Sequence, residues 1–293
     1  MKIFNRFIIY PLQFIIFLKI YFFFKLLSNK TASNLGGKIF RILGPLSKTN
    51  LILINNLKNI YTKDEKKISH IVNKSWENLG RTLAEFSHLE EITKKNNKYI
   101  TVKGANHLNS IAKKKEKVIF IAIHQSNWEV LAPTLGSYGI KLNSVYRHVN
   151  NNLIDKFILN IRKKVYKPSN SILSPKGKKS AQDMLSSIKK GFSIALLIDQ
   201  KDSSGLSVLL LGKLAKTQTG FLKLSNKFNL KIYPIENKRI SDIKFEMTVH
   251  NPVILTKNKE FDEKTSMHQI HKIIEKWIQN QPENWLWQHK RWG

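Results

Sequence analysis

The chain has 293 residues, of which 42% are hydrophobic, enough for one sizeable α/β domain together with a membrane-attaching segment. It contains no cysteine, which excludes disulfides, thiolate metal sites and cysteine nucleophiles. Fifty Lys and Arg against twenty Asp and Glu give a formal charge of +30, which favours anionic lipid, nucleic acid or an acidic protein as partner. Part of this charge is explained equally well by AT-biased codons, because Lys, Asn and Ile are abundant together.

The first predicted element is an apolar helix from Phe7 to Phe24, interrupted only by Pro11, Gln13 and Lys19. Its length matches the roughly 20 residues that cross a bilayer core. It is long and aromatic for a signal peptide, and no small-residue cleavage site follows it closely. The alternatives are a cleaved signal or a buried core helix, because Lys19 near the centre is costly in lipid unless it snorkels. We expect a membrane anchor in residues 1–35 that either spans the bilayer or lies along it.

The pair Gly36–Gly37 predicts a joint, after which a single domain of residues 36–293 begins. Thr62 and Glu65, three positions apart, form a capping box, which predicts the start of a helix that runs to about His88. Apolar residues at helical spacing give this helix one buried stripe: Ile68, Ile71, Val72, Leu79, Leu83 and Phe86.

Three apolar, β-branched runs predict strands that are buried on both faces of a sheet: Lys117–Ile123, Phe192–Ile198 and Lys231–Ile235. The second and third each follow a helix-like stretch, at Lys179–Lys190 and Thr217–Phe228. Alternation of helices with buried strands indicates an α/β fold, a largely parallel central sheet flanked by helices. No fixed-period repeat and no glycine-rich phosphate loop is present in the sequence.

The first of these strands leads directly into His124, and Glu129 follows five positions later at the start of a helix-like stretch. Ligands bind at the carboxyl ends of strands in open parallel sheets, so we expect both residues at a site. A turn between them allows the carboxylate to fold back onto the imidazole and raise its basicity, as a general base requires. The alternative is a structural, hydrogen-bonded histidine, since this spacing also arises by chance.

Six blocks of sequence carry a resemblance to a known family. They are, in chain order, WENLGRTLAEF (76–86), HQSNWEVL from His124, VYR (145–147) followed by NNLID, LLIDQ (196–200), LGKLAKTQTG (211–220) and PENWLWQHKRW (282–292). The segment from His124 to Glu129 resembles a motif of the glycerolipid and lysophospholipid acyltransferases, in which four residues separate a histidine from an acidic residue. The order and spacing of all six resemble the bacterial lipid A biosynthesis lauroyl and myristoyl acyltransferases.

The resemblance implies a glycerolipid acyltransferase-like fold and direct acyl transfer from an acyl carrier protein thioester to a hydroxyl of a lipid A precursor. His124 is then the general base and Glu129 orients its ring, with no cofactor, metal or covalent intermediate. Arg147 or backbone amides near Gln125 are the candidates for stabilising the oxyanion. The resemblance also implies a bacterial inner-membrane enzyme with its catalytic domain on the cytoplasmic face. Lys213 and Lys290 depart from the family pattern, which leaves the acyl-chain length and the acceptor open.

We assign the remaining polar residues of these blocks to substrate binding. Tyr146 and Arg147 lie near the acceptor according to the resemblance, and an arginine fork also suits phosphate or sugar-acid oxygens. Asp199 and Gln200 end a predicted strand, although a loop-capping role is equally consistent for Asp199. The full set of predicted substrate-binding residues is Gln125, Asn127, Tyr146, Arg147, Asp199 and Gln200.

The terminal WLWQHKRW segment combines aromatic and basic residues, which predicts a place at the membrane interface. No nucleic-acid-binding module accompanies it, so we expect a membrane and no nucleic acid as partner. Two alternatives remain. One is the same chemistry on another lysolipid or glycolipid; the other is a non-catalytic basic protein that binds anionic membranes or nucleic acid through its lysines.

Overall fold

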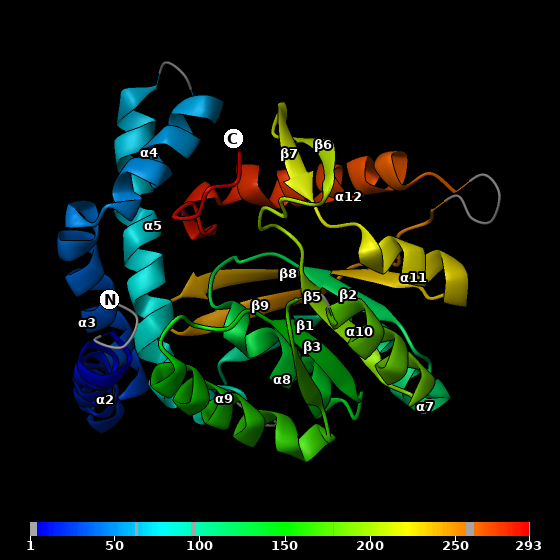
Figure 1. The fold of residues 1–293 in the computed structure, drawn as a ribbon, viewed down its shortest axis with the longest axis horizontal. Coiled ribbons are helices and arrows are strands. Elements are labelled where there is room, and N and C mark those ends of the chain that lie inside the picture. Colours follow the sequence, from blue (N-terminus) through cyan, green and yellow to red (C-terminus); the bar gives the residue numbers. More distant parts are fainter. Residues whose placement is uncertain (1–4, 62–63, 95–97, 178, 256–260, 293) are drawn as a thin grey trace.

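A seven-stranded sheet forms the centre of the molecule in the computed structural model, which describes residues 5–61, 64–94, 98–177, 179–255 and 261–292 (Figure 1). Its order is β1-β9-β8-β2-β5-β3-β4, and its neighbouring strands are parallel except for the antiparallel pair β8 and β9. The strands are β1 (Ile100–Lys103), β2 (Ile119–Ala122), β3 (Leu142–Tyr146), β4 (Ile172–Pro175), β5 (Ser193–Leu197), β8 (Ile232–Ser241) and β9 (Lys244–Val249). A separate hairpin consists of β6 (Leu206–Leu210) and β7 (Lys213–Thr217). The three predicted strands and the largely parallel α/β fold are confirmed.

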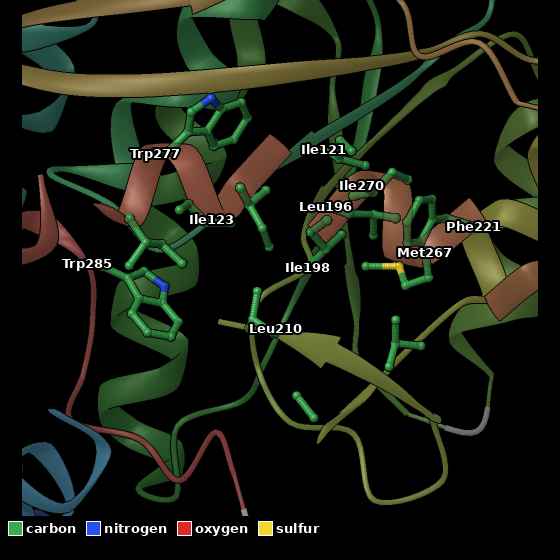
Figure 2. Packing of buried hydrophobic residues seen from close by; sticks show 14 of the residues in the cluster. Ile121, Ile123, Leu196, Ile198, Leu210, Phe221, Met267, Ile270, Trp277 and Trp285 are labelled. Carbon is green, nitrogen blue, oxygen red and sulfur yellow. The ribbon is translucent and has the colours of Figure 1, made fainter. Parts of the chain in front are cut away.

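Helices cover both faces of the sheet. In Figure 1, α8 and α9 lie below it, whereas α11, α12 and the β6–β7 hairpin lie above it. Side chains alternate across β2, so Phe120 packs with the layer that contains α7 and α8, while Ile121 packs with the opposite layer. Figure 2 shows Ile121 and Leu196 of the sheet facing Ile270 of α12. The helices of these layers are α7 (Ala105–Lys114), α8 (Leu131–Ser137), α9 (Asn152–Tyr166), α10 (Ser180–Lys189), α11 (Gly220–Phe228) and α12 (Glu263–Asn280).

Among the described residues, five further α-helices precede the sheet: α2 (Tyr10–Leu26), α3 (Asn29–Leu43), α4 (Thr49–Ile60), α5 (Glu65–Glu85) and the short α6 (Leu89–Ile92). The pair Gly36–Gly37 lies inside α3 and makes no joint. A Cβ atom on Gly36 would lie 2.5 Å from Cβ of Ala84 and 2.6 Å from the carbonyl oxygen of Gly80, both in α5. These glycines therefore serve the close crossing of two helices, since a side chain would separate them.

Helix α5 begins at Glu65, and its N-cap is Asp64, whose carboxylate accepts a 2.9 Å hydrogen bond from the amide of Lys67. The predicted capping residue Thr62 lies outside the described residues. A 3-10 turn extends the helix to His88, as predicted. The predicted helix from Thr217 is shorter than expected, because Thr217 ends strand β7 and α11 begins at Gly220.

The C-terminal segment is buried, so the prediction that it lies at a membrane interface is wrong. Trp285 is 1% exposed, and Trp287 and Arg291 are fully buried. The Trp285 and Trp287 rings contact edge to face with centroids 4.6 Å apart. Arg291 donates hydrogen bonds to the carbonyl of Lys216 and the hydroxyl of Thr217, which compensates the burial of its charge in part. The aromatic and basic composition of this segment is typical of a membrane interface, but its side chains pack into the protein core.

Candidate active site

His124 and Asp199 form a hydrogen-bonded pair at the carboxyl edge of the sheet. Strands β2 and β5 are parallel neighbours in which Ala122 pairs with Leu197, and each of the two polar residues lies two positions beyond its strand's paired residue. Nδ1 of His124 is 2.7 Å from Oδ1 of Asp199, and the backbone amide of His124 donates to Oδ2 at 2.9 Å. Equivalent positions on adjacent parallel strands thus bring together two residues that are 75 positions apart in the chain.

Asp199 is fully buried, and its surroundings favour the ionised carboxylate. Burial alone would raise its pKa, but the facing His124 imidazole and its hydrogen bonds lower the pKa far below the usual range for Asp. The indole Nε1 of Trp285 donates a third hydrogen bond, at 2.7 Å. An ionised carboxylate beside Nδ1 keeps the proton on that nitrogen, so Nε2 of His124 is left as the basic atom.

The imidazole lines a cavity of about 210 Å³. Nε2 of His124 is 3.4 Å from the side-chain amide nitrogen of Gln200, a long contact that another hydrogen-bonding group can replace. The Trp128 ring meets the imidazole edge to face with centroids 5.2 Å apart. The polar residues of the wall include Tyr146 and Arg147. Much of the remaining wall is apolar, with Phe120, Ala122, Leu131, Leu135, Ala195 and Leu197.

Glu129 lines the same cavity but does not bind His124, so the predicted contact between them is wrong. Its carboxylate accepts two hydrogen bonds from Arg162 of α9, from Nε at 3.0 Å and from Nη2 at 2.6 Å. Burial alone would lower the pKa of Arg162, but the opposing Glu129 raises it well above the usual value. The physical reason is position: the 3-10 turn Trp128–Val130 directs Glu129 toward α9, while β5 supplies a nearer carboxylate to the imidazole.

The three residues that follow His124, namely Gln125, Ser126 and Asn127, are buried in the protein. Gln125 and Asn127 are 1% and 0% exposed, and neither lines the cavity, so their predicted contact with substrate has no support in the geometry. Asn127 donates to Glu85, a buried carboxylate that also forms an ion pair with Arg239. The backbone amides of Gln125 and Ser126 donate to the carbonyls of Ile123 and Asn284, and are therefore engaged as hydrogen-bond donors.

The chain matches the model of the bacterial lipid A biosynthesis acyltransferase family over residues 1–293. The chain belongs to this family. No curated protein matches it. A crystal structure of the 1-acyl-sn-glycerophosphate (LPA) acyltransferase PlsC from Thermotoga maritima is similar over 78% of this chain and 94% of that chain, at 13% identity and a TM-score of 0.39.

In this lipid A acyltransferase family member, His124 and Asp199 form a hydrogen-bonded pair, and Tyr146, Arg147 and Gln200 lie in the wall of the adjoining cavity. Asp199 was predicted to bind substrate, but the structure places it behind the imidazole, where it positions the ring. Within the part of the chain that the structure describes, no group of three or more His, Asp or Glu side chains is arranged to hold a metal ion.

Several residues of this site were not predicted from the sequence. Arg162 follows the NNLID block, and no sequence pattern indicated it, because Glu129 was assigned to His124. Trp285 was recognised as part of a motif but was placed at a membrane. Lys176 and Gln218 also line the cavity. Lys176 belongs to none of the six blocks, and Gln218 lies in the block LGKLAKTQTG but was not assigned a role.

Proposed function

We propose that this family member transfers a fatty acyl chain from an acyl carrier protein thioester to a hydroxyl of a lipid A precursor. The observation that carries the proposal is the His124 ring, held through Nδ1 by a buried carboxylate and lining a cavity with both polar and apolar walls. The family match supports the reaction class. The donor and the acceptor are inferred from the resemblance to this family, and the roles of individual residues from the geometry.

In the proposed reaction, Nε2 of His124 removes the proton of the acceptor hydroxyl as its oxygen attacks the thioester carbonyl carbon. We assign the acceptor hydroxyl to the position that the Gln200 amide occupies beside Nε2, because that contact is long and can be replaced. Asp199 stabilises the imidazolium that forms and retains the proton on Nδ1. When the tetrahedral intermediate collapses, the carbon–sulfur bond breaks, and the imidazolium returns the proton to the thiolate. The ester and the free carrier thiol are the products.

Two candidates for oxyanion stabilisation followed from the sequence. The amides of Gln125 and Ser126 are already engaged with carbonyls, so we assign the role to the guanidinium of Arg147, which lines the cavity. The Glu129–Arg162 pair holds α9 against the turn after His124 and keeps both charges compensated inside the cavity wall. The apolar wall beside Phe120 and Leu135 suits the hydrocarbon of the acyl group.

The test uses the purified full chain with labelled acyl carrier protein thioester and a panel of acceptors: a lipid A precursor, a lysophospholipid and a glycolipid. We expect labelled product with the first acceptor and its loss in His124→Ala, with His70→Ala, an exposed histidine, as the matched control. Transfer only to another acceptor would replace the substrate assignment. Transfer to none, together with salt-sensitive membrane binding that is indifferent to His124, would favour the non-catalytic alternative.

The location of the enzyme follows from its proposed donor. An acyl carrier protein is soluble and cytoplasmic, so we place the catalytic domain on the cytoplasmic face of the bacterial inner membrane. Mass spectrometry of lipid A from cells with and without this protein gives the added acyl mass and tests the acceptor in the same measurement. An unchanged lipid A profile would contradict the assignment.

A further inference from the structure

Helix α2 packs lengthwise on the catalytic domain. The rings of Phe14, Phe17 and Tyr21 surround Phe157 of α9, with centroid distances of 6.3, 5.6 and 4.9 Å. These three residues share one face of α2 because they are three and four positions apart. Figure 1 shows α2 beside the first turns of α9. The apolar helix is thus part of the folded structure and not a tether that leaves it.

Polar contacts hold α2 near both of its ends. The side-chain amide of Asn151, the N-cap of α9, donates to the carbonyl of Tyr10 at 2.9 Å and to the side chain of Gln13 at 3.1 Å. Near the other end, Nε2 of His88 is 2.9 Å from the carbonyl oxygen of Phe24. The docked length from Tyr10 to Phe24 is about 21 Å at 1.5 Å per residue, which is most of the helix.

The opposite face of α2 is exposed and apolar. Leu12, Ile15, Ile16, Ile20 and Phe22 are each between 51% and 54% exposed. The segment Phe7–Leu26 has a mean hydropathy of 2.0, and within the described residues it is the one helix long and apolar enough to cross a membrane. A helix with protein on one side and water on the other is amphipathic, whereas this one is apolar all round. Both of its faces therefore suit apolar surroundings.

The neighbouring helix cannot enter the hydrocarbon core. Lys156, Lys163 and Lys164 of α9 are exposed, and a charged side chain is costly at the centre of a bilayer. Because α2 is bound at one end to the start of α9, through Asn151 and Phe157, and at its other end to His88, it cannot cross the bilayer while these parts of the domain remain outside. Lys19 on the exposed face of α2 agrees with this, since it would lie near the middle of a crossing helix but reaches the headgroups easily from a helix in the plane.

We propose that α2 lies in the plane of the membrane, between α9 and the acyl chains of one leaflet, and does not cross. The partner surface is a single lipid leaflet with anionic headgroups, which meet the lysines of α9 and Lys25. Asn151, which contacts Tyr10 at the start of α2, follows Arg147 by only four residues. This anchor therefore brings the part of the cavity wall that contains Tyr146 and Arg147 to the membrane surface. The proposal is independent of acyl transfer, because it concerns only how the chain is attached.

The chain has no cysteine, so single-cysteine variants of the full-length protein report one position each. Spin labels at Leu12→Cys, Ile16→Cys, Ile20→Cys and Phe23→Cys are measured for immersion depth in phosphatidylethanolamine–phosphatidylglycerol vesicles, by collision with oxygen and with a water-soluble nickel complex. An in-plane helix gives four similar, shallow depths. A crossing helix would change depth by about 16 Å from residue 12 to residue 23, and this result would overturn the proposal. Uniform accessibility to nickel, with no immersion, would overturn it as well.

Two further measurements separate the remaining outcomes. Tyr21→Cys/Phe157→Cys is expected to be joined within one chain in membranes by a short bismaleimide cross-linker, because the two rings are in contact, whereas the matched control Ile20→Cys/Phe157→Cys, from the opposite face, is not. Absence of the first cross-link would show that α2 leaves α9 in lipid, against the proposal. A disulfide-linked dimer from Ile16→Cys alone would identify a second copy of the chain, and not lipid, on the exposed face.

A membrane-impermeant maleimide tests on which side of the membrane the two ends of α2 lie. It should label Lys2→Cys, Lys30→Cys and Lys244→Cys from the same side of a vesicle. Labelling of Lys2→Cys from the other side would refute an in-plane helix.

Discussion

The indole Nε1 of Trp285 donates a 2.7 Å hydrogen bond to Oδ2 of Asp199, the carboxylate whose other oxygen binds His124. The same C-terminal segment contacts the turn after His124 through its backbone. The amide of Leu286 donates to the carbonyl of His124 at 2.9 Å, and the carbonyl of Asn284 accepts from Ser126 at 2.8 Å. The C-terminal segment therefore holds both members of the His124–Asp199 pair through hydrogen bonds.

Replacing Trp285 by Phe removes this hydrogen bond and retains most of the ring packing. We expect the free energy of unfolding to fall by about 1.5–3 kcal/mol, the range for a hydrogen bond to a charged group, and the rate of acyl transfer to fall with it. Denaturant unfolding and the transfer assay measure the two effects. Trp292→Phe is the matched control, because Nε1 of Trp292 is buried without a hydrogen-bond partner. Equal effects of the two substitutions would show that ring packing, and not the bond to Asp199, matters.

Asp199→Asn tests which carboxylate serves His124. An amide in place of the carboxylate stabilises the other tautomer of the imidazole and no longer compensates its charge, so we expect kcat to fall by about 10²–10⁴-fold. The fall should persist across the pH range, because raising the pH does not restore a carboxylate. Glu129→Gln should reduce kcat less, since Glu129 binds Arg162. A fully active Asp199→Asn beside an inactive Glu129→Gln would contradict the pairing seen in the structure.

His271 predicts how stability depends on pH. It is fully buried, and burial lowers its pKa to about 4 despite the 2.6 Å contact of Nδ1 with the carbonyl of Leu209. In the unfolded chain the pKa of a histidine is about 6.5. Between pH 6.5 and pH 4 the imidazole is therefore protonated in the unfolded chain and neutral in the folded protein. As the pH falls from about 6.5 to about 4, this residue should lower the free energy of unfolding by on the order of 3 kcal/mol.

The measurement compares urea unfolding of the wild-type chain and His271→Leu at several pH values. Other groups also titrate, but they are common to both proteins, so the difference between the two curves reports His271. We expect this difference to change steadily between pH 6.5 and 4 and to be constant above pH 7.5. His70→Leu, at an exposed position, should follow the wild type throughout. Parallel curves for His271→Leu and wild type would rule out a neutral buried imidazole.

Gly80→Ala tests the crossing of α3 and α5. The added Cβ would clash with the carbonyl oxygen of Gly36 and lie 2.5 Å from Cβ of Phe40, so the helices must separate. We expect a loss of about 1–3 kcal/mol in the free energy of unfolding. Gly220→Ala is the control, because no atom lies within 4 Å of the Cβ it would add. A Gly80→Ala protein as stable as the control would mean that the helices are not in close contact.

Local patterns in the sequence were sufficient to predict the main strands and the position of His124 at the carboxyl edge of the sheet. The run before His124 predicted strand β2, and strand ends in a parallel sheet predicted that His124, Asp199 and Gln200 would lie at one edge. These conclusions depend on consecutive residues, whose burial and spacing are encoded locally. The apolar character of α2 was equally plain, but its orientation was not, because composition does not record what lies against each face.

Only the tertiary structure decided which side chains meet. Asp199 contacts His124 because β5 is the neighbour of β2 in the sheet. The sequence of a single strand does not determine which strand will be its neighbour. Glu129 was predicted to contact His124, but it binds Arg162, which lies 33 residues later in the chain on helix α9. The Trp-rich C-terminus looked suited to a membrane surface because its residues are aromatic and basic. Its burial follows from contacts with segments distant in the chain, which no local pattern contains.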